Sequence, residues 1–554
     1  MQRKPSAFTQ QTYDVVVIGG GIFGICVAWD ATLRGLSVAL LEKGDFAHAT
    51  SANCFKMVHG GFRYLQHADL YRIRESCRER SILLHIAPHL VHPLPIVIPT
   101  YGHGMQGKEV LKAALLAYGL ITFDRNRGLQ DPQQWIPKGY AISRGETLKL
   151  FPALRQEGLT GAIVFYDGQM YSPQRLALSF LRSAANAGAE VANYVEATGF
   201  LQNKARICGV NARDILSGDD LELRGRVVIN AAGPWAEPML TLSLGLELNP
   251  PFSYSRDACL VVRRRLTENY ALALAGKTKD PDALLSRGNR HLFIVPWNHH
   301  TLVGVWHRVS KAAPDQVSLT QEELQEFITE INEACPALNL TPDDISMWNT
   351  GLVLFGDNQH LTGDLSFGKR SAIVDHAKQH QLEGLITVIG VRYTTARGVA
   401  EQAVNLAFEK LGRKSPAPLS AVTPIYGGNI ERFQSFLDHA LRSKPPNLRD
   451  DVVCLLVRHY GSEYQNVLRY LREDASWGEP LEGTTVLKAE VMHAVREEMA
   501  QKLSDVVFRR TALGTAGHPG EAPLRSCAEL MGSTLGWDRQ RTSQELHAVQ
   551  AVFP

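Results

Sequence analysis

A glycine-rich turn near the start of the chain constrains the fold more than any other stretch. Residues 14–18 read DVVVI, typical of a buried parallel strand, and residues 19–24 read GGGIFG, which satisfies the pattern Gly-x-Gly-x-x-Gly. A helical stretch follows and ends near Gly35, and a second apolar run, SVALLE, ends at Glu42. This order predicts a β-α-β unit in which Gly19, Gly21 and Gly24 let a pyrophosphate approach the amides at the helix N-terminus.

Segments far along the chain indicate which dinucleotide this unit binds. Glu42 lies about 20 residues after the glycines, where a carboxylate accepts hydrogen bonds from ribose hydroxyls and disfavours the 2′-phosphate of NADP. A short strand around Val195 could lie beside the adenine, and a strand over residues 227–230 ends in small residues at Gly233. A third strand ends at Gly390 and precedes a helix starting near Thr394, whose positive end would stabilise an anionic reduced flavin. Elements so widely separated favour one extended FAD held by a discontinuous domain.

Composition limits the other possibilities. The 554 residues suffice for two or three domains, and 45% apolar with 21% charged residues is typical of a soluble globular protein. A formal net charge of +2 gives no basic field, so nucleic acid is not expected as a partner. The eight cysteines never form a Cys-x-x-Cys pair, which fits free thiols in a reducing cytoplasm and argues against zinc or disulfides. No apolar core of a secretory signal follows the basic residues at the start.

One apolar stretch, residues 110–123, has two interpretations. It is followed by the basic residues Arg125 and Arg127. The stretch is either a core helix or an amphipathic patch that rests on a membrane surface.

A set of longer motifs resembles a known family, the FAD-dependent glycerol-3-phosphate dehydrogenases, within the D-amino-acid-oxidase-like flavoproteins. The motifs are ATS at 49–51, KMVHGGFRYL at 56–65, APHLVHPLPIVIP at 87–99, NAAGPW at 230–235, IVPW at 294–297, TTARGVAEQA at 394–403, HYGSEYQNVL at 459–468, AEVMHAVREEMAQKLSDVVFRRTAL at 489–513 and LGWDRQR at 535–541. They cover nearly the whole chain.

The resemblance implies an α/β fold with a C-terminal helical domain. We expect a Rossmann-like FAD-binding domain over 12–415, interleaved with an antiparallel-sheet substrate domain mainly at about 86–170 and 250–360. An all-helical domain is expected over 425–554. Apolar residues at helical spacing between 491 and 507 independently predict one amphipathic helix there, with Arg509 and Arg510 complementing the dipole at its end.

The resemblance also implies a reaction. The family oxidises a secondary alcohol by hydride transfer to flavin N5, so a small hydroxylated anion is the expected substrate, with glycerol 3-phosphate, oxidised to dihydroxyacetone phosphate, the best single choice. Electrons would leave to a membrane quinone or to oxygen. Cytoplasmic location, peripheral contact with the inner face of the membrane and a homodimer are further expectations. The expected cofactor contacts are Gly19, Gly21, Gly24, Glu42, Thr50, Ser51, Gly60, Gly61, Val195, Gly233, Gly390 and Thr394, and no metal is expected.

The expected catalytic residues surround the segment KMVHGGFRYLQ at 56–66. His59 is expected beside the flavin, while Arg63 and Tyr64 match the family's substrate-side pair. Further candidates for the substrate site are Arg392, at the place of a family lysine, and His307, in a strand-like run where an ordinary half-buried histidine is equally plausible. No function is expected for Lys56, because a lysine one helical turn away from His59 is more often solvated.

Several departures from the family leave the substrate open. Val353 stands where the family has an arginine for substrate phosphate, and Cys259 stands where it commonly has a histidine. Losing the arginine removes a contact worth roughly 1.5 to 3 kcal/mol. Either His307, Arg308 and Arg392 take over these functions, or the protein oxidises another alcohol, hydroxy acid or amine. A non-catalytic flavin-binding protein is the third possibility.

Overall fold

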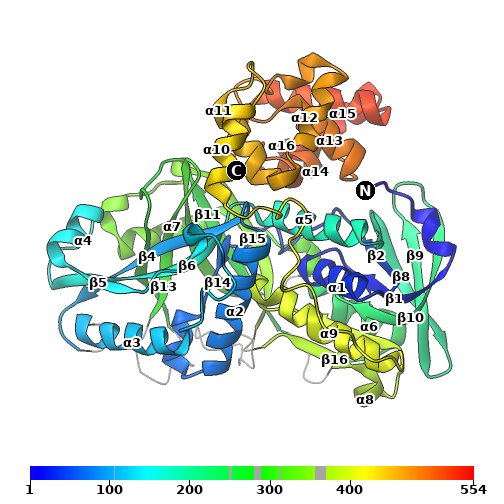
Figure 1. Ribbon diagram of the computed structural model, residues 1–554, viewed down its shortest axis with the longest axis horizontal. Coiled ribbons are helices and arrows are strands. Elements are labelled where there is room, and N and C mark those ends of the chain that lie inside the picture. Colours follow the sequence, from blue (N-terminus) through cyan, green and yellow to red (C-terminus); the bar gives the residue numbers. More distant parts are fainter. Residues whose placement is uncertain (105–106, 249–252, 280–288, 311–312, 356–369) are drawn as a thin grey trace.

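Two β-sheets and a helical C-terminal unit make up the computed structural model, which describes residues 1–104, 107–248, 253–279, 289–310, 313–355 and 370–554 (Figure 1). The sheets lie side by side, and the C-terminal helices sit above the region between them. This arrangement confirms the α/β fold class expected from the sequence.

The first sheet is mainly parallel and contains the predicted β-α-β unit. Its path is β16 (Ala372–Asp375), β17 (Leu385–Ile389), β10 (Asp220–Asn230), β1 (Thr12–Ile18), β2 (Val38–Glu42) and β7 (Glu190–Asn193). The hairpin β8 (Val195–Asn203) and β9 (Arg206–Asp214) extends β10, and β16 is an antiparallel edge strand. The parallel strands carry continuous apolar runs because both faces of the sheet are buried.

One face of this sheet is covered by α1 (Ile22–Leu33), with α5 (Pro173–Asn186) and α9 (Ala396–Lys410) packed against it. Helix α1 lies between the sheet and two other helices, so it is apolar on nearly all sides. The other face packs against α6 (Ala236–Leu244). The sheet therefore presents the carboxyl ends of β1, β2, β10 and β17 at one edge.

The second sheet has the order β15 (Ile345–Phe355), β11 (Ser253–Val262), β14 (His300–Ser310), β13 (Asn289–Trp297), β12 (Ala271–Lys279), β4 (Val91–Tyr101), β6 (Leu159–Met170) and β3 (Met57–Val58), with β5 (Tyr140–Ser143) beside β6. Its described pairs are antiparallel except β4 with β12. Helix α7 (Gln321–Ala334) buries apolar residues against one part of it. Helices α3 (Lys108–Ile121) and α4 (Arg144–Leu150) also belong to this region. Helix α2 (Leu70–Ile86) buries its C-terminal half in the core of the first sheet, and α8 (His376–His380) follows β16 in that sheet.

The C-terminal unit is helical, with α10 (Phe433–Ser443), α11 (Asp450–Tyr460), α12 (Gln465–Leu468), α13 (Lys488–Glu497), α14 (Leu503–Asp505), α15 (Glu521–Leu535) and α16 (Arg539–Gln550). The expectation of a single helix over 491–507 is wrong. The chain breaks after α13, where Met499 takes a left-handed backbone angle of +57°. Among the described residues, no helix combines the length and the apolarity needed to cross a membrane.

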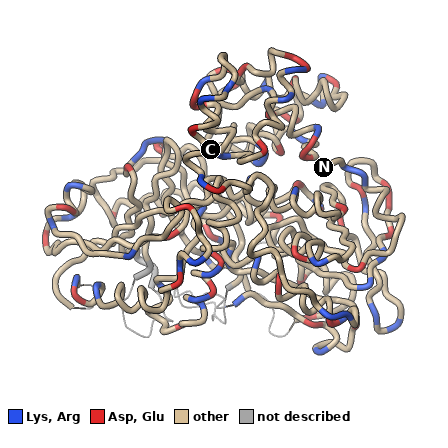
Figure 2. The backbone as a smooth tube through the Cα atoms, viewed as in Figure 1, with Lys and Arg blue, Asp and Glu red and all other residues tan. Residues whose placement is uncertain are grey.

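Charge is spread over the whole molecule. In the view of Figure 2, basic and acidic residues alternate along the backbone without forming a face of one sign. This distribution matches the small net charge of +2. Recognition of a charged ligand must therefore depend on local side chains.

Candidate functional site

Two cavities meet between the sheets. The dinucleotide groove, of about 540 Å³, runs along the carboxyl ends of β1, β2 and β10. The substrate cavity, of about 410 Å³, lies against the second sheet. Four residues line both of them and define their junction: Cys54, Val353, Val391 and Tyr393. A ligand that fills the groove thus reaches the substrate cavity at these residues.

The glycine turn fits the backbone approach that a dinucleotide needs. Gly19 has a backbone angle of +103°, and a Cβ there would lie 2.6 Å from the Ala231 carbonyl oxygen. A Cβ on Gly24 would lie only 2.0 Å from the Gly19 carbonyl oxygen, so Gly24 permits close packing of α1 on β1. The amide of Ile22 at the start of α1 donates to Ser51 Oγ at 2.9 Å. These features hold a helix N-terminus against the groove, as FAD binding requires.

Glu42 fastens the same turn. Its carboxylate accepts hydrogen bonds from the amides of Gly20 at 2.7 Å and Gly44 at 2.8 Å. Thr50 Oγ1 donates to the Leu352 carbonyl at 3.0 Å, which ties the segment after Glu42 to β15. The groove is thus shaped by contacts between segments that are distant in sequence.

Most of the expected cofactor residues line the dinucleotide groove, but four do not. Those in the groove are Gly19, Gly21, Glu42, Thr50, Ser51, Val195, Gly233 and Gly390. Gly61 and Thr394 line the substrate cavity instead. Gly24 lies behind the turn, and Gly60 lies against Arg80, whose Nη1 would be 2.1 Å from a Cβ at that position. Gly60 therefore allows a buried arginine to pack closely, and its amide donates to Asp167 at 2.5 Å.

The five expected catalytic residues all line the substrate cavity: His59, Arg63, Tyr64, His307 and Arg392. Arg63 and Tyr64 come from the short helix Phe62–His67, which starts at Gly61 with a backbone angle of +81°. The Arg392 guanidinium donates to Glu75 at 2.5 Å and to Ser76 at 2.7 Å, both on α2. These contacts fix Arg392 at the wall of the cavity.

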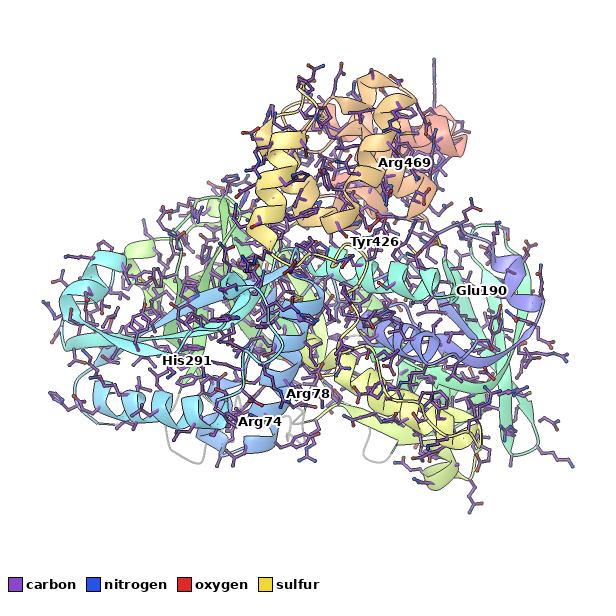
Figure 3. The ribbon with its side chains drawn as sticks, viewed as in Figure 1. Arg74, Arg78, Glu190, His291, Tyr426 and Arg469 are labelled. Carbon is purple, nitrogen blue, oxygen red and sulfur yellow. The ribbon has the colours of Figure 1, made fainter. Side chains whose placement is uncertain are left out.

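Two imidazoles of the cavity are held neutral. Burial, followed by the charges of Arg392 and Arg63, lowers the pKa of His59 to about 3. Burial and Arg63 lower the pKa of His291 to about 4. His291, which Figure 3 labels in the region of the second sheet, was missed by sequence reasoning. The alternation of side chains along β13, which turns His291 and Phe293 toward the same cavity, is the signal that could have found it.

His307 has an acidic partner that sequence reasoning also missed. Its Nδ1 lies 2.7 Å from the Asp257 carboxylate, on the directly opposite position of β11. Both residues line the substrate cavity. A carboxylate in this place orients the ring, as an orienting group does beside a general base.

Two positions that depart from the family lie close to the junction. Val353 lines both cavities, so an aliphatic side chain faces the groove there. Cys259 is buried, and burial raises the pKa of its thiol to about 11, which makes it a neutral packing residue. Among the described residues, the cations that line the cavity are Arg63, Arg392 and Lys56. The expectation that Lys56 is solvated is wrong, because its side chain is buried.

Family models match both parts of the chain. Residues 14–406 match the family described as FAD dependent oxidoreductase. Residues 420–542 match the C-terminal domain of alpha-glycerophosphate oxidase.

Curated relatives extend over almost the full length. The chain is 29% identical over 547 residues to a glycerol-3-phosphate dehydrogenase of Synechocystis sp., covering 96% of this chain and 95% of that protein. It is 32% identical to a probable mitochondrial glycerol-3-phosphate dehydrogenase of Dictyostelium discoideum, covering 96% of this chain and 82% of the relative.

A solved structure shares the fold. The glycerol-3-phosphate dehydrogenase of Bacillus halodurans, complexed with FAD, superposes with a TM-score of 0.77 at 23% identity. The match covers 99% of this chain and 96% of that chain.

Proposed function

Since the chain belongs to the FAD-dependent glycerol-3-phosphate dehydrogenases, we propose that it oxidises glycerol 3-phosphate to dihydroxyacetone phosphate. The observation that carries this proposal is the convergence of Arg63, Arg392 and two histidines on a cavity that joins the dinucleotide groove. FAD, when bound, accepts the two electrons and the hydrogen removed from the substrate carbon. The family assignment confirms the resemblance inferred from the sequence motifs.

The charged side chains suit an anionic substrate. Arg63 and Arg392 supply guanidinium groups for a phosphate, and Arg392 is already oriented by Glu75. These two arginines compensate for the aliphatic Val353. The largely apolar walls, including Phe55, Phe165 and Phe293, exclude water and strengthen each polar contact.

His307 is the group best placed to receive the hydroxyl proton. Asp257 holds the ring through Nδ1, which makes Nε2 the nitrogen that would accept the hydroxyl proton. His59, whose pKa is lowered to about 3, is a much weaker base and is better suited to orienting a neutral hydroxyl by a hydrogen bond.

Anaerobic mixing of the purified yellow protein with glycerol 3-phosphate tests the function. Bleaching of the flavin absorption band within seconds supports it. If millimolar glycerol 3-phosphate leaves the spectrum unchanged while another hydroxy acid or an amine bleaches it, the substrate is wrong. If only dithionite bleaches the band, the protein binds flavin without turnover.

Helix α3 supports a membrane quinone as the electron acceptor. Leu116, Leu120 and Phe123 at the exposed face and end of this helix are 72%, 77% and 78% exposed. Leu111 and Ala114, on the same helix, line the substrate cavity. An apolar surface that continues into the cavity gives a lipid-soluble acceptor a route to the flavin, and we propose that α3 rests on the membrane.

A further inference from the structure

Lys56 places a positive charge inside the protein, beside the junction of the two cavities. Its side chain is 1% exposed, and within the part of the chain that the structure describes its Nζ has no hydrogen-bond partner. The ammonium lies 4.8 Å from the centre of the Trp297 ring. Burying a cation without a carboxylate costs several kcal/mol, which a cation–π contact of about 2 kcal/mol does not offset.

The backbone at Lys56 is held in an uncommon conformation. Its φ angle of +58° lies in the left-handed region, which costs a non-glycine residue roughly 1 to 2 kcal/mol. The Lys56 carbonyl accepts a hydrogen bond from the Met170 amide at 2.8 Å, so the segment is fixed to β6. The fold thus maintains two unfavourable features at one residue, which is typical of functional positions.

Two thiols near Lys56 are neutral. Burial raises the pKa of the Cys54 and Cys259 thiols, although the charge of Lys56 acts in the opposite direction on both. Asn349 lies opposite Cys259 on β15. Neither Cys54 nor Cys259 supplies a negative charge to balance the lysine.

The location of Lys56 places its charge near the expected position of the flavin ring. Cys54, two residues before it, lines both the dinucleotide groove and the substrate cavity. A flavin whose nucleotide part lies in the groove must bring its ring to this junction for the substrate to reach it. Uptake of two electrons and one proton, the equivalent of a hydride, leaves the neutral ring with one negative charge.

We propose that the Lys56 ammonium, buried beside the junction of the two cavities, stabilises the negative charge of the reduced flavin through the protein interior, so that it raises the reduction potential of the cofactor. The proposal rests on FAD binding and is independent of the substrate. Charge beside the flavin ring is a recognised way for a protein to tune its electronics. Lys56 is thereby a cofactor-tuning residue, distinct from the arginines that face the substrate.

The test is the midpoint potential of the holoenzyme, measured by equilibration with reference dyes in the absence of substrate. In Lys56→Met, the ratio of reduced to oxidised flavin should fall at least tenfold at a given potential, a shift of about 30 mV for a two-electron couple. Lys56→Arg, which keeps the charge, should have a midpoint potential close to that of the wild type. A Lys56→Met holoenzyme with the potential of the wild type overturns the proposal.

Lys43→Met is the matched control. Lys43 lines the dinucleotide groove and, like Lys56, lies over a tryptophan. Its Nζ is 4.3 Å from the Trp235 ring centre, but it pairs with Asp315 and is absent from the junction. Its replacement should leave the potential unchanged, and an equal fall there would contradict a specific function of Lys56. If Lys56→Met does not retain FAD, the midpoint potential of Lys56→Gln is measured instead. An unchanged potential in Lys56→Gln also overturns the proposal.

Discussion

At the scale of single residues, the clearest prediction concerns Arg63. Replacing it with alanine removes a guanidinium from the substrate cavity, a charge-assisted contact of about 1.5 to 3 kcal/mol. The KM for glycerol 3-phosphate should rise roughly 10- to 100-fold while the flavin spectrum stays the same. Steady-state kinetics measure this, with Arg74→Ala as the control. Arg74, labelled in Figure 3, pairs with Asp124 outside the cavity. Unaltered substrate affinity in Arg63→Ala would remove this residue from the phosphate site.

Residues differ in how far the sequence alone predicts their place. Arg63 and Tyr64 were predictable because they lie in a contiguous segment, KMVHGGFRYL, that resembles a family motif, and both line the cavity. Lys56 and Asp257 were not. The burial of Lys56 depends on Trp297, and the importance of Asp257 depends on its register opposite His307, 50 residues later in the chain. The pairing of strands that are distant in the chain cannot be deduced from the spacing of residues along the sequence.

At the scale of elements, α3 makes a prediction about membrane association. Leu120→Glu together with Phe123→Glu places two charges on the exposed apolar face, where insertion into lipid becomes unfavourable. Co-sedimentation with vesicles of anionic phospholipid should fall at least tenfold. Leu242→Glu is the control, because Leu242 on α6 is 87% exposed but belongs to another element. Equal binding by the α3 variant and the wild type would exclude α3 as the contact surface.

Elements also show where a periodic pattern is insufficient. The apolar spacing between 491 and 507 predicted one helix, but the chain turns at Met499 and divides it into α13 and α14. The apolar residues keep a helical spacing across the break because both helices bury them in the C-terminal core. Arg509 and Arg510 were expected only to complement a helix dipole, whereas both pair with Asp45 of the first sheet region. A tertiary contact determines their position.

At the scale of the whole molecule, buried ion pairs join the C-terminal unit to the FAD-binding region. Arg175 on α5 donates to Glu498 at 2.7 Å. Burial alone would raise the pKa of Glu498, but the charge of Arg175 outweighs it and lowers the pKa to about 2. Tyr426, labelled in Figure 3, lies in the connection between the units, where its hydroxyl accepts from Asn466 at 3.1 Å. Such pairs contribute geometric specificity, and losing one partner leaves an uncompensated charge. We therefore expect these contacts to let the C-terminal unit influence FAD binding.

Asp45 is the contact through which this action should be strongest. It lies between Glu42 and Ser51, on the segment that borders the dinucleotide groove, and it accepts hydrogen bonds from Arg509, Arg510 and Asn193. Asp45→Asn leaves the buried Arg510 without a carboxylate and Arg509 with Asp505 alone, so the free energy of unfolding should fall by about 3 to 5 kcal/mol. Because the segment loses its anchor, the Kd for FAD should rise at least tenfold in a titration of the apoprotein. Glu497→Gln, which breaks more exposed ion pairs with Arg182, Arg469 and the N-terminal amine, should leave the Kd near the wild-type value. An Asp45→Asn protein that melts earlier but binds FAD as tightly as the wild type would show that the C-terminal unit supports only the fold.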